Sequence, residues 1–184
     1  MKATGIVRRI DDLGRVVIPK EIRKTMRIRE GDPLEIYTDR EGEVIFKKYS
    51  PIGELQNFAS EYADTLHKTS SLPIFICDRD AVIAVAGASK REYLDKKISK
   101  ELEEIIDARS IYQNSSGKED KFVIDMGREH IISCAAPIIS EGDVIGCVLS
   151  GWQPSSPFSE KIASEIEAKL IQTAAIFLGK QMES

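Results

Sequence analysis

Alternating hydrophobic and polar positions, rich in β-branched residues, mark the first fifty residues as a strand-forming region. Four short strands are expected, at residues 5–10, 15–18, 34–38 and 43–49. Two tight polar turns are expected to join them in pairs, at residues 11–14 and 39–42. The pattern therefore predicts two hairpins.

A short helix is expected between these hairpins. Ile22 and Met26 lie four positions apart among charged residues, which is typical of a helix over residues 20–28 with one apolar edge. The helix should end near residues 30–33, where glycine and proline do not continue a helix. A ββαββ unit of about 50 residues buries only about 60% of its surface. We therefore expect two copies to complete one core between them.

The pattern changes at Ser50-Pro51, where a preferred capping residue precedes a proline suited to the first turn of a helix. A helix over residues 51–69 is expected there, with an apolar stripe made of Ile52, Leu55, Phe58, Ala59, Tyr62 and Leu66. Next, the pattern predicts a β-hairpin at 72–77 and 81–86, a charged helix at 90–108 and a polar loop at 114–120. Three strands at 121–125, 130–139 and 144–151 and a final helix at 156–181 are expected to follow.

The final helix has two differently patterned parts. Its early part is amphipathic through Ile162, Ile166 and Leu170, whereas residues 174–178 are apolar nearly all round. A helix that is apolar on every side needs a further surface to cover it, which we expect to be the helix at 51–69 and its copy in a second subunit. The whole chain is predicted as α+β, with domains at residues 1–50 and 51–184.

Composition places the chain among ordinary globular proteins, with 184 residues, 42% hydrophobic and 30% charged. No apolar run approaches the roughly 18 residues of a membrane-spanning helix, and Arg8 and Arg9 interrupt any signal peptide. The three cysteines are widely spaced in apolar segments, which favours neither disulfides nor a metal site. We therefore expect a cytoplasmic protein with no membrane partner, no metal and no cofactor.

The net charge of −4 conceals an asymmetry along the chain. Residues 1–29 hold nine Lys and Arg against three Asp and Glu, whereas residues 51–184 hold 14 against 21. Two differently charged modules therefore share one chain, and only the first has the charge that suits a polyanion.

Three motifs of the first module resemble AbrB-type swapped-hairpin DNA-binding domains: Thr-Gly-Ile-Val-Arg at 4–8, Asp-Asp-Leu-Gly-Arg-Val-Val-Ile-Pro at 11–19 and Glu-Ile-Arg at 21–23. The resemblance implies that two protomers interleave their hairpins and face DNA with cationic side chains. It carries over to the following residues: Arg8, Arg15, Arg23, Lys24 and, less closely, Arg9. Position 24 is often arginine in that family; lysine keeps the charge but gives up the planar bidentate fork.

Two alternatives to a DNA-binding surface remain open at this point. The cations could form a solvated face, as most charged clusters do, or the module could serve only to dimerise the chain. Electrophoretic shift with residues 1–53 discriminates between DNA binding and assembly alone.

The second module resembles a GAF-type sensor domain at residues 74–85 with Gly87, and at residues 136–139 followed by 142–146. The resemblance implies an α+β sandwich that binds small molecules between its sheet and its helix-and-loop side, where residues 90–117 would supply part of a lid. No specific ligand signature is visible. A GAF-like fold with a filled core, used for dimerisation, is the alternative.

The remaining chemistry-bearing residues indicate no catalytic site. His67 and His130 are unlinked and are expected at the surface, and Cys77 and Cys147 are expected to fill the sheet core. The sequence contains no phosphate-binding glycine loop, no Gly-x-Ser-x-Gly and no His-Glu-x-x-His. We therefore do not expect an enzyme.

Together, the two resemblances imply a homo-oligomeric transcription regulator of spore-forming bacteria that binds duplex DNA and controls sporulation genes as activator or repressor. Its second domain would sense a small molecule or oligomerise, and two dimer interfaces in one chain suggest a tetramer. A metabolite-sensing or protein-binding module whose first domain only dimerises is the alternative. An antitoxin is a third possibility, although a folded 130-residue domain does not suit a toxin-neutralising tail.

Overall fold

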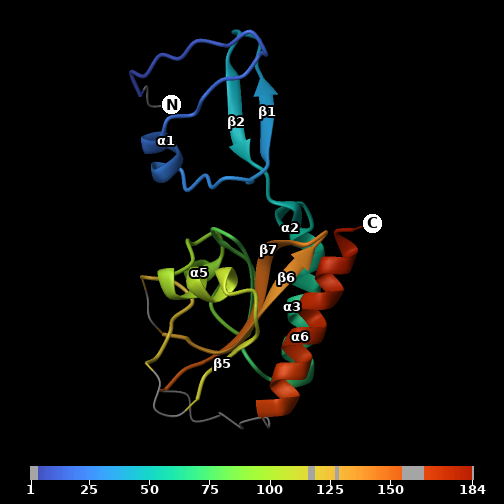
Figure 1. Ribbon diagram of the computed structural model, residues 1–184. Helices are drawn as coiled ribbons and strands as arrows, with labels where there is room; N and C mark the ends of the chain where they lie inside the picture. The colour runs from blue at the N-terminus through green and yellow to red at the C-terminus, as the bar shows by residue number, and fades with distance from the viewer. Residues whose placement is uncertain (1–3, 116–118, 127–128, 155–163, 184) are drawn as a thin grey trace. The chain divides into compact units, whose positions relative to one another are not determined.

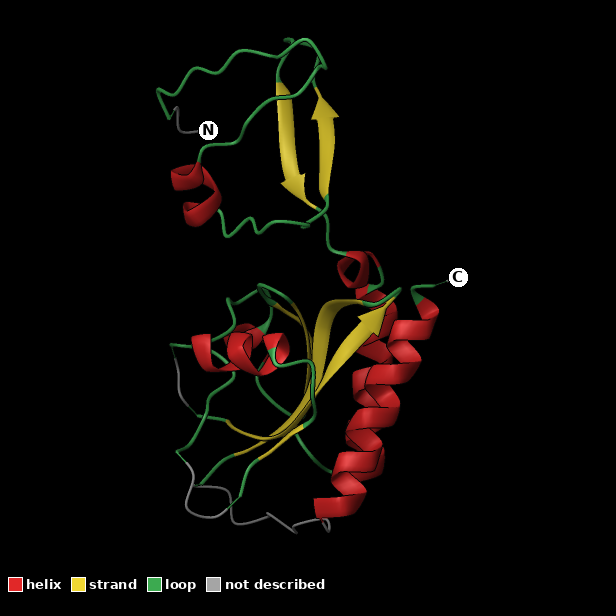
Figure 2. Ribbon diagram, in the orientation of Figure 1, coloured by secondary structure: helices red, strands yellow, loops and turns green. Residues whose placement is uncertain are grey.

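The computed structural model describes residues 4–115, 119–126, 129–154 and 164–183. The chain divides into two compact units, Met1–Tyr49 and Ser50–Ser184, and each contains both helical and strand segments (Figures 1 and 2).

Residues 4–49 of the N-terminal unit form one short helix and one β-hairpin. Helix α1 spans Lys20–Thr25 and follows Pro19, whose fixed φ suits the start of a helix. Strands β1 (Leu34–Thr38) and β2 (Val44–Lys48) pair antiparallel, with Ile36 opposite Phe46. These elements confirm the predicted helix, with fewer residues than expected, and the predicted second hairpin.

The first predicted hairpin is only partly present. Residues 4–18 contain a closed turn at 11–15 but no strand, and Figure 2 draws them as loop. The prediction of strands at residues 5–10 and 15–18 is therefore wrong for the single chain. The physical reason is that an isolated two-stranded hairpin is marginally stable in water, and these residues bury no face of their own.

The described residues of this unit bury almost nothing. Pro19 is the one buried residue among residues 4–49. Many of its apolar side chains are exposed, and they occur on all of its segments: Ile6, Val7, Ile10, Leu13, Val16, Val17, Met26, Ile36, Tyr37, Val44, Ile45, Phe46 and Tyr49. Such a surface is unusual for a body that stays alone in water.

The C-terminal unit is built on a five-stranded antiparallel sheet. Its strands are β3 (Ile74–Asp78), β4 (Val82–Ala86), β5 (Tyr112–Gln113), β6 (Ile131–Ser140) and β7 (Asp143–Trp152). They are arranged in the order β4-β3-β7-β6-β5. Four of them confirm predicted strands. The short edge strand β5 was not predicted, because two residues carry no periodicity.

Helices cover both faces of this sheet. Helices α3 (Gln56–Ser70) and α6 (Ser164–Gln181) lie together on one face and α5 (Lys100–Asp107) lies on the other (Figure 1). The short helix α2 (Pro51–Glu54) precedes α3, and its capping residue Ser50 accepts the N–H of Gly53 at 3.2 Å. Leu55 leaves the helical region between α2 and α3, so the helix predicted over 51–69 has two segments.

The helix predicted over residues 90–108 is also interrupted. Helix α4 spans only Lys90–Tyr93, and Asp95 adopts a left-handed conformation with φ 60°. The N–H of Asp95 donates to the carbonyl of Val82, and the N–H of Val82 donates to the carbonyl of Lys96. This segment therefore satisfies the backbone hydrogen-bonding groups of Val82 at the edge of β4 instead of continuing a helix.

Two further predictions differ from the structure. Residues 121–125 make isolated bridges, Ile98 to Ile124 and Phe122 to Ile131, instead of a strand. The face of α6 that packs on the sheet carries Ile171, Ala174 and Leu178, whereas Ile166 of the predicted stripe is 54% exposed. Part of the predicted loop at 114–120 and the predicted helix start at 156–163 lie outside the described residues.

The core fills both faces of the sheet. Beneath α3 and α6 it contains small and branched residues, among them Ala59, Ala63, Ile138, Ile171 and Ala174. A Cβ at Gly179 would collide with the carbonyl oxygen of Ile139, so α6 approaches β6 very closely. Beneath α5 the core contains larger side chains, among them Phe75, Tyr93, Leu102 and Leu149.

None of the helices in the described part of the chain has both the length and the apolar character needed to cross a membrane.

Candidate nucleic-acid interface

Asp11 organises the turn that carries Arg15. The N–H of Asp11 donates to the carbonyl of Arg15 at 3.0 Å, and Gly14 occupies the left-handed region with φ 77°. The Oδ1 atom of Asp11 accepts the N–H of Leu13 at 3.1 Å and the N–H of Arg15 at 2.8 Å. One carboxylate oxygen therefore closes the turn from within.

The second oxygen of Asp11 binds the Arg15 side chain. Its Oδ2 lies 2.8 Å from Nε of Arg15, whose side chain is 69% exposed. The hydrogen bonds that Arg15 donates, first from its backbone and then from its side chain, lower the pKa of Asp11. The carboxylate therefore stays charged, and the guanidinium is held at one edge only.

The turn between β1 and β2 has the same backbone construction. The Oδ1 atom of Asp39 accepts the N–H of Glu41 at 2.9 Å and the N–H of Glu43 at 2.8 Å. Gly42 has a positive φ of 84°, as Gly14 has in the first turn. The two turns thus share an Asp-x-x-Gly pattern, and they differ in the residue that follows the glycine.

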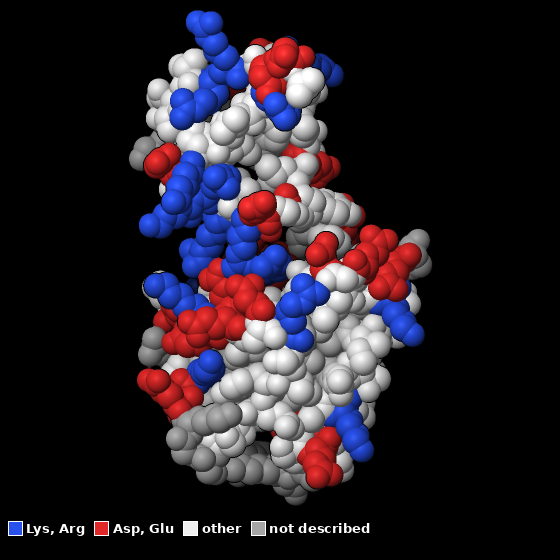
Figure 3. Space-filling model, viewed as in Figure 1, with Lys and Arg blue, Asp and Glu red and all other residues white. Residues whose placement is uncertain are grey.

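The other predicted DNA contacts are all exposed. Arg8 and Arg9 lie on the extended segment before the first turn, and Arg23 and Lys24 lie in the last turn of α1. Lys and Arg side chains gather in the region of α1 on the face of this unit seen in Figure 3. The structure joins the Arg15 side chain to Asp11, and the Arg8 side chain donates to the carbonyl of Val7 at 3.4 Å.

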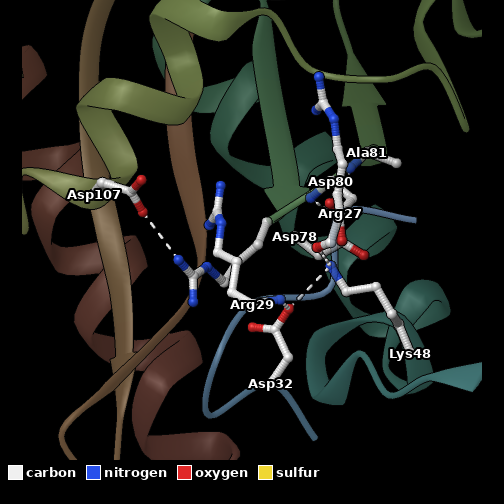
Figure 4. Close-up of polar contacts among 9 residues, drawn as sticks. Arg27, Arg29, Asp32, Lys48, Asp78, Asp80, Ala81 and Asp107 are labelled. Atoms are coloured by element: carbon white, nitrogen blue, oxygen red, sulfur yellow. Dashed lines mark hydrogen bonds and ion pairs between the residues drawn. The ribbon is translucent and has the colours of Figure 1, made fainter. Parts of the chain in front are cut away.

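A second group of polar residues holds the segment after α1. Arg27 adopts a positive φ of 52°, and its carbonyl accepts the Nζ of Lys48 at 3.0 Å. The same Nζ lies 3.4 Å from Oδ2 of Asp32, which also accepts the N–H of Arg29 at 2.8 Å. Figure 4 shows these residues. The contacts tie the chain after α1 to strand β2, and so fix the end of the helix that carries Arg23 and Lys24.

Sequence reasoning missed Asp11 and Lys48 as structural members of this region. A signal for Asp11 was available, because the spacing of Asp11 and Gly14 recurs at Asp39 and Gly42. No sequence signal pointed to Lys48, since its partners lie 16 and 21 residues away along the chain.

The C-terminal unit contains a buried polar pair beneath α4. The hydroxyl of Tyr93 lies 2.9 Å from Nδ1 of His130, and the two rings meet edge to face with Phe75 nearby. Burial lowers the pKa of His130, and Glu92 opposes that shift. The expectation of a surface histidine at position 130 is therefore wrong: aromatic neighbours bury it, and one ring nitrogen has a partner.

The cysteines lie in the sheet core, as expected for Cys77 and Cys147. Burial is the largest cause that raises the pKa of all three, to about 12 for Cys134. Among the described residues, no group of His, Cys, Asp and Glu is placed to hold a metal ion.

One surface cavity lies at the end of α5. Its volume is about 310 Å³, and its walls include Glu104, Ile111, Tyr112 and Lys121. The Nζ of Lys121 lies 5.4 Å from the centre of the Tyr112 ring, and burial raises the pKa of that tyrosine. Side chains fill the space directly between the sheet and α5, so the cavity lies beside the core and not within it.

Each of the two units matches a known protein family. Residues 54–183 match the family described as "Stage V sporulation protein T C-terminal, transcription factor". Residues 7–53 match the family described as "Antidote-toxin recognition MazE, bacterial antitoxin".

Two curated relatives come from Bacillus subtilis (strain 168). Stage V sporulation protein T is 54% identical over 184 residues, which covers 100% of this chain and 99% of the relative. Transition state regulatory protein AbrB is 63% identical over 51 residues, which covers 28% of this chain and 52% of AbrB.

Solved structures resemble the fold of the C-terminal unit at low identity. Residues 122 to 287 of a methyl-accepting chemotaxis protein match with a TM-score of 0.50 and 16% identity, covering 71% of this chain and 91% of that one. The GAF domain of A. Aeolicus nlh2 matches with a TM-score of 0.49 and 16% identity, covering 68% and 82%.

The two units thus define a transcription regulator with an AbrB-like N-terminal domain and an α+β C-terminal domain. The chain belongs to the stage V sporulation protein T family.

Proposed function

We propose that residues 1–50 form a dimer that binds duplex DNA through Arg8, Arg9, Arg15, Arg23 and Lys24. The observation that carries this proposal is the exposure of all five cations on a unit whose apolar side chains are also exposed. The exposed cations are available to an anionic partner, and the exposed apolar surface favours association with a second copy. An interleaved dimer provides that second copy and brings ten cations onto one body.

The binding energy comes mainly from phosphate neutralisation. Each Lys or Arg that neutralises a phosphate releases counterions, so the logarithm of the binding constant falls with the logarithm of salt concentration by about 0.9 per contact. Selectivity comes from a few arginine contacts to base edges in the major groove and from the deformability of the site. Lys24 lacks the bidentate fork, so it contributes to affinity more than to selectivity.

A salt titration of the full-length chain tests this proposal. The probe is a fluorescent duplex that the wild-type protein has selected from a random-sequence library. Arg15→Ala is expected to weaken binding and to flatten the salt slope by nearly two, because both copies lose a contact of about 0.9. Arg91→Ala, an exposed arginine of the C-terminal unit, is the matched control and should keep the wild-type slope. A binding constant that does not respond to salt contradicts the proposal.

We further propose that the C-terminal domain, residues 51–184, joins dimers into a tetramer through α3 and α6. Phe58, Tyr62 and Phe177 form a ring cluster on these helices, with Tyr62 and Phe177 centred 5.3 Å apart. Phe177 is 38% exposed and its neighbour Ile176 is 54% exposed. Contiguous aromatic and aliphatic groups at a surface favour association with a second copy.

Light scattering of the full-length chain tests this assembly. Phe177→Glu places a charge in the cluster and should convert a tetramer to a dimer, whereas Gln172→Glu, on an exposed position of the same helix, should not. A tetramer that survives Phe177→Glu contradicts an interface at this surface.

A small-molecule sensor is the second candidate for the C-terminal domain, and the cavity beside α5 favours it. A thermal-shift screen of metabolites on the full-length chain separates the two roles. Compounds whose stabilisation is lost in Lys121→Ala support sensing at this cavity, and no stabilisation across a broad library favours assembly alone.

In this proposal the protein acts in the cytoplasm, where its DNA lies, and controls sporulation genes without catalysing a reaction. The filled core beneath α5 supports a role in assembly over ligand binding between the sheet and that helix. The sign of regulation depends on where the operator lies, and both activation and repression are compatible with one DNA-binding surface.

A further inference from the structure

The two turns of the N-terminal unit offer an internal comparison. In both, an aspartate Oδ1 accepts the backbone N–H groups two and four residues further along, and a glycine with positive φ stands between them. The residue after that glycine is Arg15 in the first turn and Glu43 in the second. The backbone construction therefore does not depend on an arginine at this position.

Asp11 makes a side-chain contact that has no equivalent at Asp39. Its Oδ2 atom binds Nε of Arg15 at 2.8 Å while Oδ1 remains on the backbone. A carboxylate on the Nε side of a guanidinium leaves the opposite edge, with its two Nη groups, facing away. That edge presents the pair of parallel N–H groups that recognises a phosphate or a guanine.

We propose that Asp11 is a positioning residue for DNA binding, which holds the guanidinium of Arg15 so that its Nη edge meets the DNA. This inference rests on the proposed DNA-binding function of the same unit. A long exposed side chain loses rotamer freedom when it binds, and that loss weakens the complex. A tether from a closed turn restricts Arg15 before DNA arrives, so less freedom is lost on binding.

The sign of the effect separates positioning from simple charge. Asp11 is negative, so electrostatics alone predicts that its neutralisation strengthens binding to phosphate. Positioning predicts the opposite. Asp39→Asn measures the effect of charge alone, because it changes the net charge of the unit by the same amount and the contacts of the Asp39 side chain among the described residues are to the backbone N–H groups of Glu41 and Glu43.

The experiment measures binding of the full-length chain to the selected duplex by fluorescence anisotropy, at about 50 to 200 mM salt. Asparagine keeps an Oδ1 acceptor for the backbone N–H groups but has no carboxylate for Nε of Arg15. Asp11→Asn is therefore expected to weaken binding by about fivefold or more, since each of two copies loses a tether. Asp39→Asn should bind as tightly as wild type or more tightly.

A double variant completes the test. If Asp11 acts through Arg15, Asp11→Asn weakens the Arg15→Ala protein no further, so the two changes are not additive. Thermal unfolding of Asp11→Asn and of Asp39→Asn at the wild-type temperature shows that both turns remain folded.

The outcomes distinguish this inference from the function on which it rests. Asp11→Asn and Asp39→Asn proteins that bind alike, in either direction, overturn the positioning role while salt-dependent binding by wild type upholds the DNA-binding function. Additive effects of Asp11→Asn and Arg15→Ala overturn it as well. A wild-type chain that shows no salt-dependent binding overturns both.

Discussion

The two units of this chain use apolar residues in opposite ways. In the C-terminal unit, Phe75, Leu102 and Ile138 are fully buried within a single chain, whereas in the N-terminal unit Val7 is 83% exposed and Leu13 is 71% exposed. Both units are rich in β-branched residues, so composition does not separate them. What separates them is whether the apolar positions find partners inside one chain.

This difference indicates which unit can fold within one chain and which unit needs a second copy. A closed core within one chain stabilises the C-terminal unit, and part of its exposed apolar surface lies on α6, at Ile166, Ile176 and Phe177. The N-terminal unit has about 50 residues and almost no core, so its stability depends on a second copy. Four predictions sharpen or break this comparison.

The largest effect is expected from Ile138→Ala in the C-terminal core. Ile138 is fully buried beneath α3 and α6, and its truncation removes apolar contacts and leaves a cavity. The free energy of unfolding should fall by about 2–5 kcal/mol. Urea unfolding monitored by tyrosine and tryptophan fluorescence measures this loss. A change below about 1 kcal/mol would mean that the core is not close-packed at this position.

The same substitution in the N-terminal unit, Ile36→Ala, should act through association. Ile36 is 61% exposed in the single chain, so its truncation removes little within that chain. In a dimer that buries it, both copies lose about 1–2 kcal/mol of apolar burial, and the dimer dissociation constant should rise at least tenfold. Sedimentation of the full-length chain measures it. An unchanged dissociation constant would falsify a role for this face in dimerisation.

A smaller effect is expected from Ser150→Ala. The Ser150 hydroxyl donates to the buried carboxylate of Glu167 at 2.5 Å and so ties α6 to β7. Its removal leaves the carboxylate short of a donor and should lower the free energy of unfolding by about 1–3 kcal/mol. Thr173→Ala removes an exposed hydroxyl from the same helix and should change it by less than about 0.5 kcal/mol. An equal fall in the free energy of unfolding in both variants would mean that the buried hydrogen bond stabilises the fold no more than the exposed hydroxyl does.

The smallest expected effect is a pH dependence from His130. Burial lowers the pKa of His130 in the folded chain, so below the ordinary pKa of about 6.5 the unfolded chain binds more protons. The free energy of unfolding should therefore fall as pH falls through 6.5, until the lowered pKa is reached. His130→Gln should remove this slope, whereas Tyr93→Phe, which removes only the hydrogen bond, should retain it. A wild-type slope of opposite sign contradicts the burial argument.

Sequence periodicity predicted most of the strands in both units, because β1, β2, β3, β4, β6 and β7 alternate or run apolar over several residues. It failed where tertiary contacts override local preference. The segment around Asp95 pairs with the edge of β4, and residues 4–18 lack a partner strand within the chain. His130 was misplaced because sequence gives no sign of the aromatic rings that bury it.

The five cations were identified from motif resemblance, and their contact with DNA stays a prediction. The spacing of Asp11 and Gly14 is visible in the sequence, but Asp-x-x-Gly is an ordinary turn pattern, so only the structure shows that Asp11 also binds the side chain of Arg15.

Amide hydrogen exchange of the full-length chain at increasing protein concentration tests most directly the claim that a second copy completes the N-terminal unit. The account predicts that the amides of residues 5–10 and 15–18 become protected together as the dimer forms, and that Ile36→Ala shifts this protection to higher concentration. Exchange of these amides at the rates of an unfolded chain, at concentrations where the protein binds DNA, would contradict it.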